Sequence, residues 1–196
     1  ADIFDVNNKG NKEVIFDVQF ESGVNGNSEG SRAFQKFSPS GTVSGALGHN
    51  LPTKEVYGLF ADNDKRKSAY FIVTKNGVIG TGKLKQTSAT VADGGSNIIV
   101  LRYADVLLML AECYAEKDDV SKSNEYLNLI KKRAGIEEVS IGDATLIKEE
   151  IALERRKELV NEGHRWFDLI RTGKAVEVMN AYFTRTPGYT GITISE

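Results

Sequence analysis

The sequence predicts a mainly helical α+β fold, and three observations support this prediction. Amphipathic helical periodicity fills residues 98–180, whereas strand-like alternation, turn residues and loops fill residues 1–97. The chain has 196 residues, 40% of them hydrophobic and 27% charged. That length and composition suit one globular domain with a substantial core. We therefore expect a single domain over residues 1–196, ending in an extended tail at 181–196.

The first half of the chain predicts a strand, a long loop and a small β-hairpin. Residues 13–20 alternate and are rich in β-branched and aromatic side chains, as in a strand. Residues 21–51 are dense in Gly, Ser and Asn and are too long for a simple connection, and long loops in compact domains are often functional. Residues 70–79 contain two short apolar runs around Asn76-Gly77, which predicts a hairpin with a type I′ turn.

Two helices follow, and their apolar stripes predict a helical hairpin. The first stripe, at helical spacing, consists of Leu101, Ala104, Leu108, Ala111 and Ala115. The second consists of Ser123, Leu127, Ile130 and Ala134, after which Gly135 is placed to end the helix. Small residues where two backbones approach are typical of tetratricopeptide-like hairpins. One such hairpin cannot bury its own apolar face, so further helices must pack against it.

A third helical run, about residues 145–162, has an unusual face on which carboxylates alternate with isoleucines. Projection at 100° per residue groups Ile147, Ile151, Arg155, Glu158 and Glu162. Charges facing a core are tolerated only when they are paired and hydrogen-bonded. We therefore expect a semi-buried ion network of Arg155, Glu158, Glu162, Arg165 and Asp168. The adjacent aromatic residues Trp166 and Phe167 are expected to anchor the core.

Composition excludes several classes of function. The formal net charge is only −2, which argues against a nucleic-acid-binding or polybasic membrane surface. No segment approaches the roughly 18 apolar residues of a membrane span, and the first residues are not a signal peptide. The single cysteine, Cys113, excludes an internal disulfide. We expect no cofactor and no metal site.

Enzymatic signatures are weak. Residues 77–83 match the first seven positions of a phosphate-binding loop, but Leu84 replaces the Ser or Thr that would hold Mg²⁺, and the hairpin explains the pattern better. Glycoside hydrolysis needs two carboxylates across a cleft, whereas the helical glutamates are expected to pair with arginine. His49 and His164 have no nucleophile motif near them. Asp62 and Asp64 lack the later ligands of a calcium loop. We expect no catalytic residues.

Four short motifs resemble the C-terminal part of the SusD/RagB family. In order, they are Arg102-Tyr103-Ala104-Asp105, Arg133-Ala134-Gly135, Glu154-Arg155-Arg156 and Glu162-Gly163-His164-Arg165-Trp166-Phe167-Asp168-Leu169. Upstream, Ile15-Phe16-Asp17-Val18 and the D-x-R segment Asp64-Lys65-Arg66 are similar to the family more loosely. The resemblance implies a non-catalytic surface lipoprotein of the outer membrane. Such a protein captures oligosaccharides for a SusC-like, TonB-dependent transporter and is held to the membrane by a lipid anchor. The anchor cysteine and the N-terminal helical half of the family are absent here, so we expect exposed apolar surface or dimerisation.

Glycan capture would need aromatic faces for sugar rings and polar groups for hydroxyls. The long loop and the segment after it supply Phe34, Phe37, His49, Asn50 and Tyr57, which are the candidate ligand-binding residues. Either phenylalanine could instead fasten the loop to the core, since buried Phe is the norm. The alternative function is a helical-hairpin scaffold that binds another protein around Arg102 and Tyr103.

Overall fold

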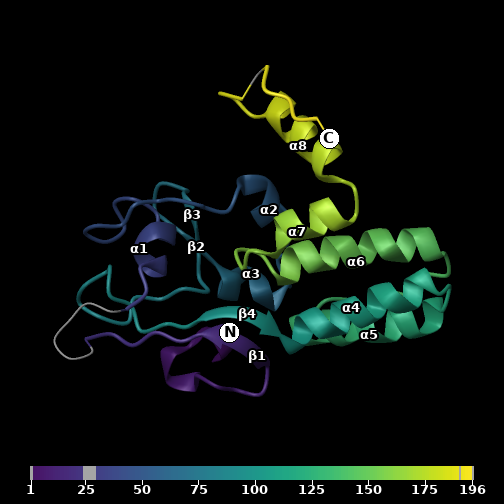
Figure 1. Ribbon diagram of the computed structural model, residues 1–196, viewed down its shortest axis with the longest axis horizontal. Helices are drawn as coiled ribbons and strands as arrows, with labels where there is room; N and C mark the ends of the chain where they lie inside the picture. The colour runs from purple at the N-terminus through teal and green to yellow at the C-terminus, as the bar shows by residue number, and fades with distance from the viewer. Residues whose placement is uncertain (1, 24–29, 190, 196) are drawn as a thin grey trace. The chain divides into compact units, whose positions relative to one another are not determined.

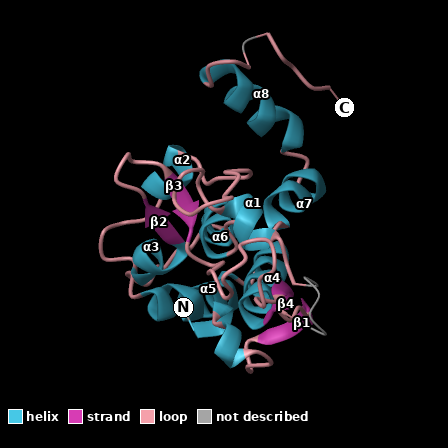
Figure 2. Cartoon of the chain, turned by 90° about the vertical axis from the view of Figure 1, so that its left-hand side faces the viewer, coloured by secondary structure: helices cyan, strands magenta, loops and turns pink. Residues whose placement is uncertain are grey.

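The computed structural model describes residues 2–23, 30–189 and 191–195 of the chain (Figure 1). Parts of the predicted loop (24–29) and tail (190 and 196) therefore lie outside the described residues. The chain forms two compact units, Ala1–Glu162 and Gly163–Glu196. Helices dominate both units, and Figure 2 shows two separate pairs of short strands in the first, which confirms the predicted fold class.

Three helices form the main core of the first unit: α4 (Tyr103–Glu116), α5 (Val120–Ala134) and α6 (Ala144–Glu158). Small side chains let α4 and α5 approach closely, since Ala104, Ala111 and Ala115 are all 0% exposed. The larger core residues are Leu107, Leu108, Leu127, Ile130, Ile147 and Ile151. The side chains of Asp119 and Asp143 cap the starts of α5 and α6, and Gly135 ends α5 at φ +75°. The predicted helical hairpin and its third helix are confirmed.

Two boundaries of this layer differ from the prediction. Leu101 and Arg102 belong to strand β4 (Ile98–Arg102), because they pair with strand β1 (Val14–Val18), and α4 begins only at Tyr103. Leu101 is 41% exposed and is not part of the α4 core stripe. The third helix ends at Glu158, and Glu162 follows in a turn where Asn161 adopts φ +60°.

Strands β1 and β4 form an antiparallel pair with irregular register between Val14 and Asp17. One face of this pair is apolar and exposed within the first unit. Its members, with exposures of 37–55%, are Ile15, Phe16, Val18, Val100, Leu101 and the adjoining Tyr103. Exposed apolar patches of this kind mark interaction surfaces more often than chance placement does.

Strands β2 (Phe71–Val73) and β3 (Ile79–Thr81) form the predicted hairpin. The type I′ turn was wrong. The Gly77 amide donates to the Thr74 carbonyl, the Thr74 amide donates to the Val78 carbonyl, and Gly77 has φ +75°. Asn76 is not among the described residues with positive φ, which a type I′ turn would require. No helix follows Lys83 before β4 in the described chain, so residues 77–83 do not form a phosphate-binding loop.

Short helices connect the remaining parts of the first unit. They are the 3₁₀ turns η1 (Asp2–Phe4) and η2 (Val6–Asn8) and the helices α1 (Ala33–Phe37), α2 (Lys54–Gly58) and α3 (Lys65–Tyr70). The Asp93 carboxylate accepts bonds from Ser22, Gly23 and Gly30 and so fastens the long loop. A second core joins α3 to the hairpin through Phe60, Tyr70, Phe71 and Ile79.

The second unit contains α7 (His164–Arg171) and α8 (Ala175–Arg185). Helix α8 corrects the expected tail boundary, since the chain becomes extended only at Thr186, where the following Pro187 disfavours helix. Trp166 and Phe167 were expected to be core anchors but are 47% and 70% exposed, whereas Leu169 of the same helix is buried. In both units, no described helix is long and apolar enough to cross a membrane.

Candidate functional site

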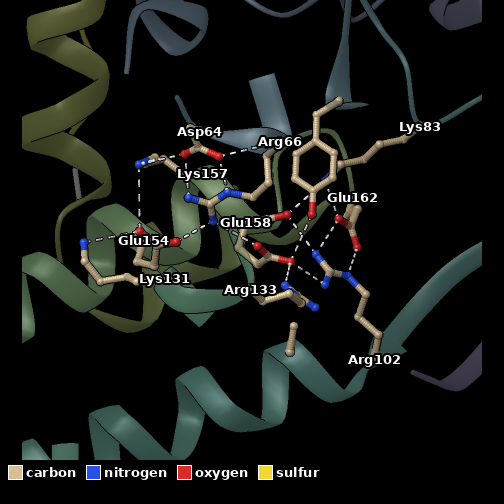
Figure 3. Close-up of polar contacts among 12 residues, drawn as sticks. Asp64, Arg66, Lys83, Arg102, Lys131, Arg133, Glu154, Lys157, Glu158 and Glu162 are labelled. Carbon is tan, nitrogen blue, oxygen red and sulfur yellow. Dashed lines mark hydrogen bonds and ion pairs between the residues drawn. The ribbon is translucent and has the colours of Figure 1, made fainter. Parts of the chain in front are cut away.

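Glu158 is the centre of a buried ion network in the first unit (Figure 3). Its side chain is 0% exposed, and its two oxygens accept bonds from Arg66 Nη1 at 2.9 Å, Arg102 Nη1 at 2.7 Å and Tyr70 Oη at 3.1 Å. Arg133 reaches the same carboxylate from a half-exposed position on α5. Both carboxylate oxygens of Glu158 therefore accept hydrogen bonds from arginine side chains or from the Tyr70 hydroxyl.

Helical spacing explains how one short segment supplies three acids. Glu154 and Glu158 are one helical turn apart on α6, and Glu162 follows in the next turn of chain. Arg66 of α3 binds Glu154, and Arg102 at the end of β4 binds Glu162 through Nε at 2.6 Å. Both arginines also bind Glu158. The network therefore joins α3, β4 and α6.

A second group of charges extends the network from Arg66. The Asp64 carboxylate accepts from Arg66 Nε at 2.9 Å and Nη2 at 2.8 Å, an arrangement that fixes the guanidinium plane. Lys157 Nζ lies 3.3 Å from Asp64 Oδ2. Figure 3 shows Asp64, Arg66 and Lys157 beside Glu154, with Lys131 on its other side.

The carboxylates stay ionised because the surrounding cations outweigh burial. Burial alone would raise the pKa of Glu158, but Arg102, Arg133 and Arg66 hold it far below the usual 4.5. The pKa of Glu162 is likewise raised by burial and lowered, on balance, by Lys83 and Arg102. A carboxylate fixed in this state is a poor general acid, so the network suits a structural role.

Unlike the acids, Lys83 has a pKa that moves in the direction that burial favours. Its ammonium is buried, lies 3.8 Å from the centre of the Tyr70 ring and donates to the Glu158 carbonyl at 2.9 Å and to Glu162. Burial lowers the pKa of Lys83 from its usual 10.5 to about 8, although Glu162 opposes that change.

This pKa predicts a rise in stability at moderately alkaline pH. Between about pH 8 and 10, the folded chain has lost the Lys83 proton and the unfolded chain still holds it, so unfolding becomes less favourable as pH rises. The rise is up to about 3 kcal/mol. Above about pH 10 it is opposed by Tyr70, whose pKa burial raises.

Urea unfolding at pH 7 and pH 9.5 measures the effect against Lys83→Met, which lacks the titrating group. The difference in unfolding free energy between the native chain and this variant should shift in favour of the native chain at pH 9.5. If this difference is the same at both pH values, or shifts in favour of the variant at pH 9.5, the lowered pKa of Lys83 is contradicted.

An open cleft of about 600 Å³ lies next to this network. Its lining combines aromatic and apolar with polar side chains: Tyr57, Asp62, Asn63, Asp64, Lys65, Lys67, Ser68, Phe71 and Val73. Asp64 belongs both to the cleft wall and to the network. The volume is within the usual range of small-ligand sites, about 300–1,000 Å³.

Tyr57, from α2, is one of two aromatic residues in the lining of this cleft, the other being Phe71. Its ring meets Phe71 edge to face, with ring centroids 5.3 Å apart, and Lys67 Nζ lies 5.1 Å from the Tyr57 ring centroid. Lys67 in turn donates to Asp62 at 2.7 Å. An aromatic ring bordered by ammonium, carboxylate, amide and hydroxyl groups can contact both the apolar and the polar surface of a sugar.

The other candidate binding residues lie elsewhere in the first unit. Phe34 and Phe37 are half-buried on α1, and His49 and Asn50 are exposed in the loop that follows. None of the four lines this cleft. The Asn50 carbonyl accepts a long bond of 3.4 Å from Asn161. Of the five, Tyr57 alone is brought to the cleft.

The residues of the expected ion network lie on several elements of the two units. Glu158 and Glu162 share the network described above, while Arg155 points to Asp105 of α4, with 2.7 Å between Nη1 and Oδ1. Asp168 lies in the second unit and pairs with Arg171 at 2.8 Å. Arg165 also belongs to that unit.

Sequence reasoning missed most partners of these acids, because they come from distant segments. Arg66 and Glu158 are separated by 92 positions, and Arg102 and Glu158 by 56. The D-x-R segment, Asp64 to Arg66, was the signal that could have identified one of them. In the sequence, Lys83 stands out only as the last residue of the segment that resembles a phosphate-binding loop. Among the described residues, no group of three or more His, Cys, Asp or Glu side chains could hold a metal ion.

The fold and cleft together define a helical-hairpin protein with an open, partly aromatic surface site. A family model described as "SusD family" matches residues 61–195. The chain therefore belongs to the SusD family.

Individual relatives agree with this assignment. SusD-like protein P38 of Formosa agariphila is 40% identical over 93 residues, which are 43% of this chain and 18% of that protein. SusD-like protein P25 of the same organism is 27% identical over 227 aligned residues, covering 91% of this chain and 43% of that protein. Surface glycan-binding protein A from Bacteroides thetaiotaomicron, solved in complex with laminarihexaose, superimposes with a TM-score of 0.78 at 26% identity, covering 100% of this chain and 49% of that one. The chain thus spans less than half the length of these relatives.

Proposed function

We propose that this protein captures oligosaccharides at the Tyr57 cleft by stacking and hydrogen bonding, without covalent chemistry. The observation that carries the proposal is a cleft of about 600 Å³ that joins the Tyr57 ring to amide, hydroxyl and charged groups. Membership of the SusD family supports it, as does the similarity to a solved surface glycan-binding protein. Phe34, Phe37, His49 and Asn50 remain candidate contacts for a longer glycan that extends beyond the cleft.

In this proposal the protein acts at the outer-membrane surface as the lipid-anchored partner of a SusC-like, TonB-dependent transporter. The captured sugar is passed on unchanged, so no cofactor is needed. The resemblance of the sequence motifs to the SusD/RagB family supports this part of the proposal. Co-purification with the transporter from solubilised outer membranes tests it.

Calorimetric titration tests glycan capture directly. The ligands are plant, host and microbial oligosaccharides, and the proteins are this chain and a form extended to the length of its relatives. Tyr57→Ala should weaken binding about fivefold, since aromatic contacts of this kind contribute about 0.5–1.5 kcal/mol. Because the ring also packs on Phe71, the melting temperature of the variant is measured beside its affinity, so that lost binding is distinguished from lost stability.

Tyr103→Ala is the matched control. Tyr103 is a more exposed tyrosine, 52%, that lies at the start of α4 and does not line the cleft. Unchanged affinity of Tyr57→Ala, or equal loss in both variants, would contradict the proposed site.

A second candidate function, contact with another protein, is favoured by the exposed apolar face of β1 and β4. Tyr103 adjoins that face, whereas Arg102, the other residue named for the scaffold alternative, is 0% exposed and cannot contact a partner. Loss of transporter co-purification in Leu101→Ser, with glycan binding intact, would assign this face to the partner.

A further inference from the structure

The cleft contains an ion pair whose two members differ in burial. Lys67 Nζ donates to Asp62 Oδ1 at 2.7 Å; the lysine side chain is 22% exposed and the aspartate side chain 99% exposed. Lys67 also lies over the Tyr57 ring, with 5.1 Å between its Nζ and the ring centroid. The ammonium is therefore held in the cleft, while its counter-ion is fully in solvent.

An exposed ion pair of this kind is easily exchanged. Such pairs contribute little to stability, because water solvates both members well. The cation–π contact with Tyr57 does not depend on Asp62. Another anion arriving in the cleft can thus take the place of the Asp62 carboxylate while Lys67 keeps its position.

Lys65 adds a second cation to the cleft wall. Its side-chain stem lies against Gly135, where an added Cβ would be 2.8 Å from Lys65 Cε, so the glycine leaves room for the stem. No ion pair to Lys65 occurs in the part of the chain that the structure describes. The remaining acid of the lining, Asp64, is 0% exposed and already bound by Arg66 and Lys157.

We infer that the cleft selects an acidic saccharide, whose uronate carboxylate or sulfate replaces Asp62 at Lys67 while the sugar ring contacts Tyr57. The Lys67 ammonium has one exchangeable partner, the exposed Asp62 carboxylate, and Lys65 adds a second positive charge to the lining, so an anionic ligand is favoured over a neutral one. This inference rests on the proposed glycan capture and adds the chemical class of the ligand.

Paired titrations test the inference with probes of equal length, a hexamer of galacturonic acid and the neutral laminarihexaose. The acidic hexamer should bind about tenfold more tightly than the neutral one at low salt, since a charge-assisted hydrogen bond adds about 1.5–3 kcal/mol. That advantage should shrink as ionic strength rises.

Three variants locate the effect. Asp62→Asn should tighten binding of the acidic hexamer about threefold by removing the competing carboxylate. The variant should fold normally, because the Asp62 side chain is exposed. Lys67→Met should weaken acidic binding about tenfold and leave neutral binding within about twofold. Lys148→Met, whose lysine pairs with Glu116 at 2.8 Å outside the cleft, is the control and should change neither.

The outcomes separate this inference from the proposed function. Tighter binding of laminarihexaose, or acidic binding that ignores both Asp62→Asn and Lys67→Met, would overturn acid selection and leave glycan capture standing. If neither this chain nor its extended form binds any sugar, glycan capture fails and the inference fails with it.

Discussion

Replacing Glu158 with glutamine should lower the free energy of unfolding by about 3–5 kcal/mol, as expected when one partner of a buried ion pair is removed. Glutamine keeps the size of the side chain but cannot balance Arg66 and Arg102, whose side chains are 6% and 0% exposed. The melting temperature should fall by roughly 10 °C. Urea unfolding followed by circular dichroism measures both quantities.

Glu150→Gln is the matched control, because it makes the same chemical change on the same helix. Glu150 is 25% exposed and binds Lys131 at 2.6 Å, so its loss should cost about 1 kcal/mol or less. Equal losses in the two variants would show that burial of the network does not determine its contribution.

Lowering the pH should remove the contribution of the Glu158 carboxylate to stability. The pKa of Glu158 is lower in the folded chain than in the unfolded chain, so its contribution is complete above the unfolded value near 4.5 and is lost as pH falls below it. Glu158→Gln should therefore flatten the acid limb of the stability profile. An unchanged acid limb in this variant would contradict the depressed pKa.

Arg102→Met should destabilise the protein by a similar amount, about 3–5 kcal/mol. The side chain is 0% exposed and binds Glu158, Glu162 and the Glu158 carbonyl, the last at 2.8 Å. Methionine preserves most of the apolar stem but provides no donor, so two buried carboxylates lose their principal partner. Urea unfolding again gives the value.

Arg133→Met provides an internal comparison. Arg133 reaches two of the three carboxylates that Arg102 contacts, namely Glu13 and Glu158, but its side chain is 44% exposed. Water can replace much of what it contributes, so the expected loss is about 1 kcal/mol or less. A loss in Arg133→Met as large as that in Arg102→Met would mean that contact partners, and not burial, set the energy.

Local periodicity was sufficient to predict the helices because each core stripe is contained in one segment. The spacing of Ala104, Leu108 and Ala111 defines the buried face of α4, and Gly135 marks the end of α5. The start of α4 could not be predicted from periodicity, because Leu101 continues the helical stripe but is held in a strand by β1. Long-range pairing there overrides a local preference.

Spacings within single segments were enough to predict the helical hairpin and the acidic face of α6, and short motifs were enough to indicate the family. The cations that meet Glu158 and the candidate aromatic residue that borders the cleft depend on how distant segments pack. Arg66, Lys83 and Arg102 are far apart in the chain, and packing alone brings them to Glu158: the two arginines bind its carboxylate, and Lys83 binds its backbone carbonyl. Tyr57 differs from Phe34 and Phe37 in the same way: all three are aromatic, but of the three only Tyr57 lines the cleft.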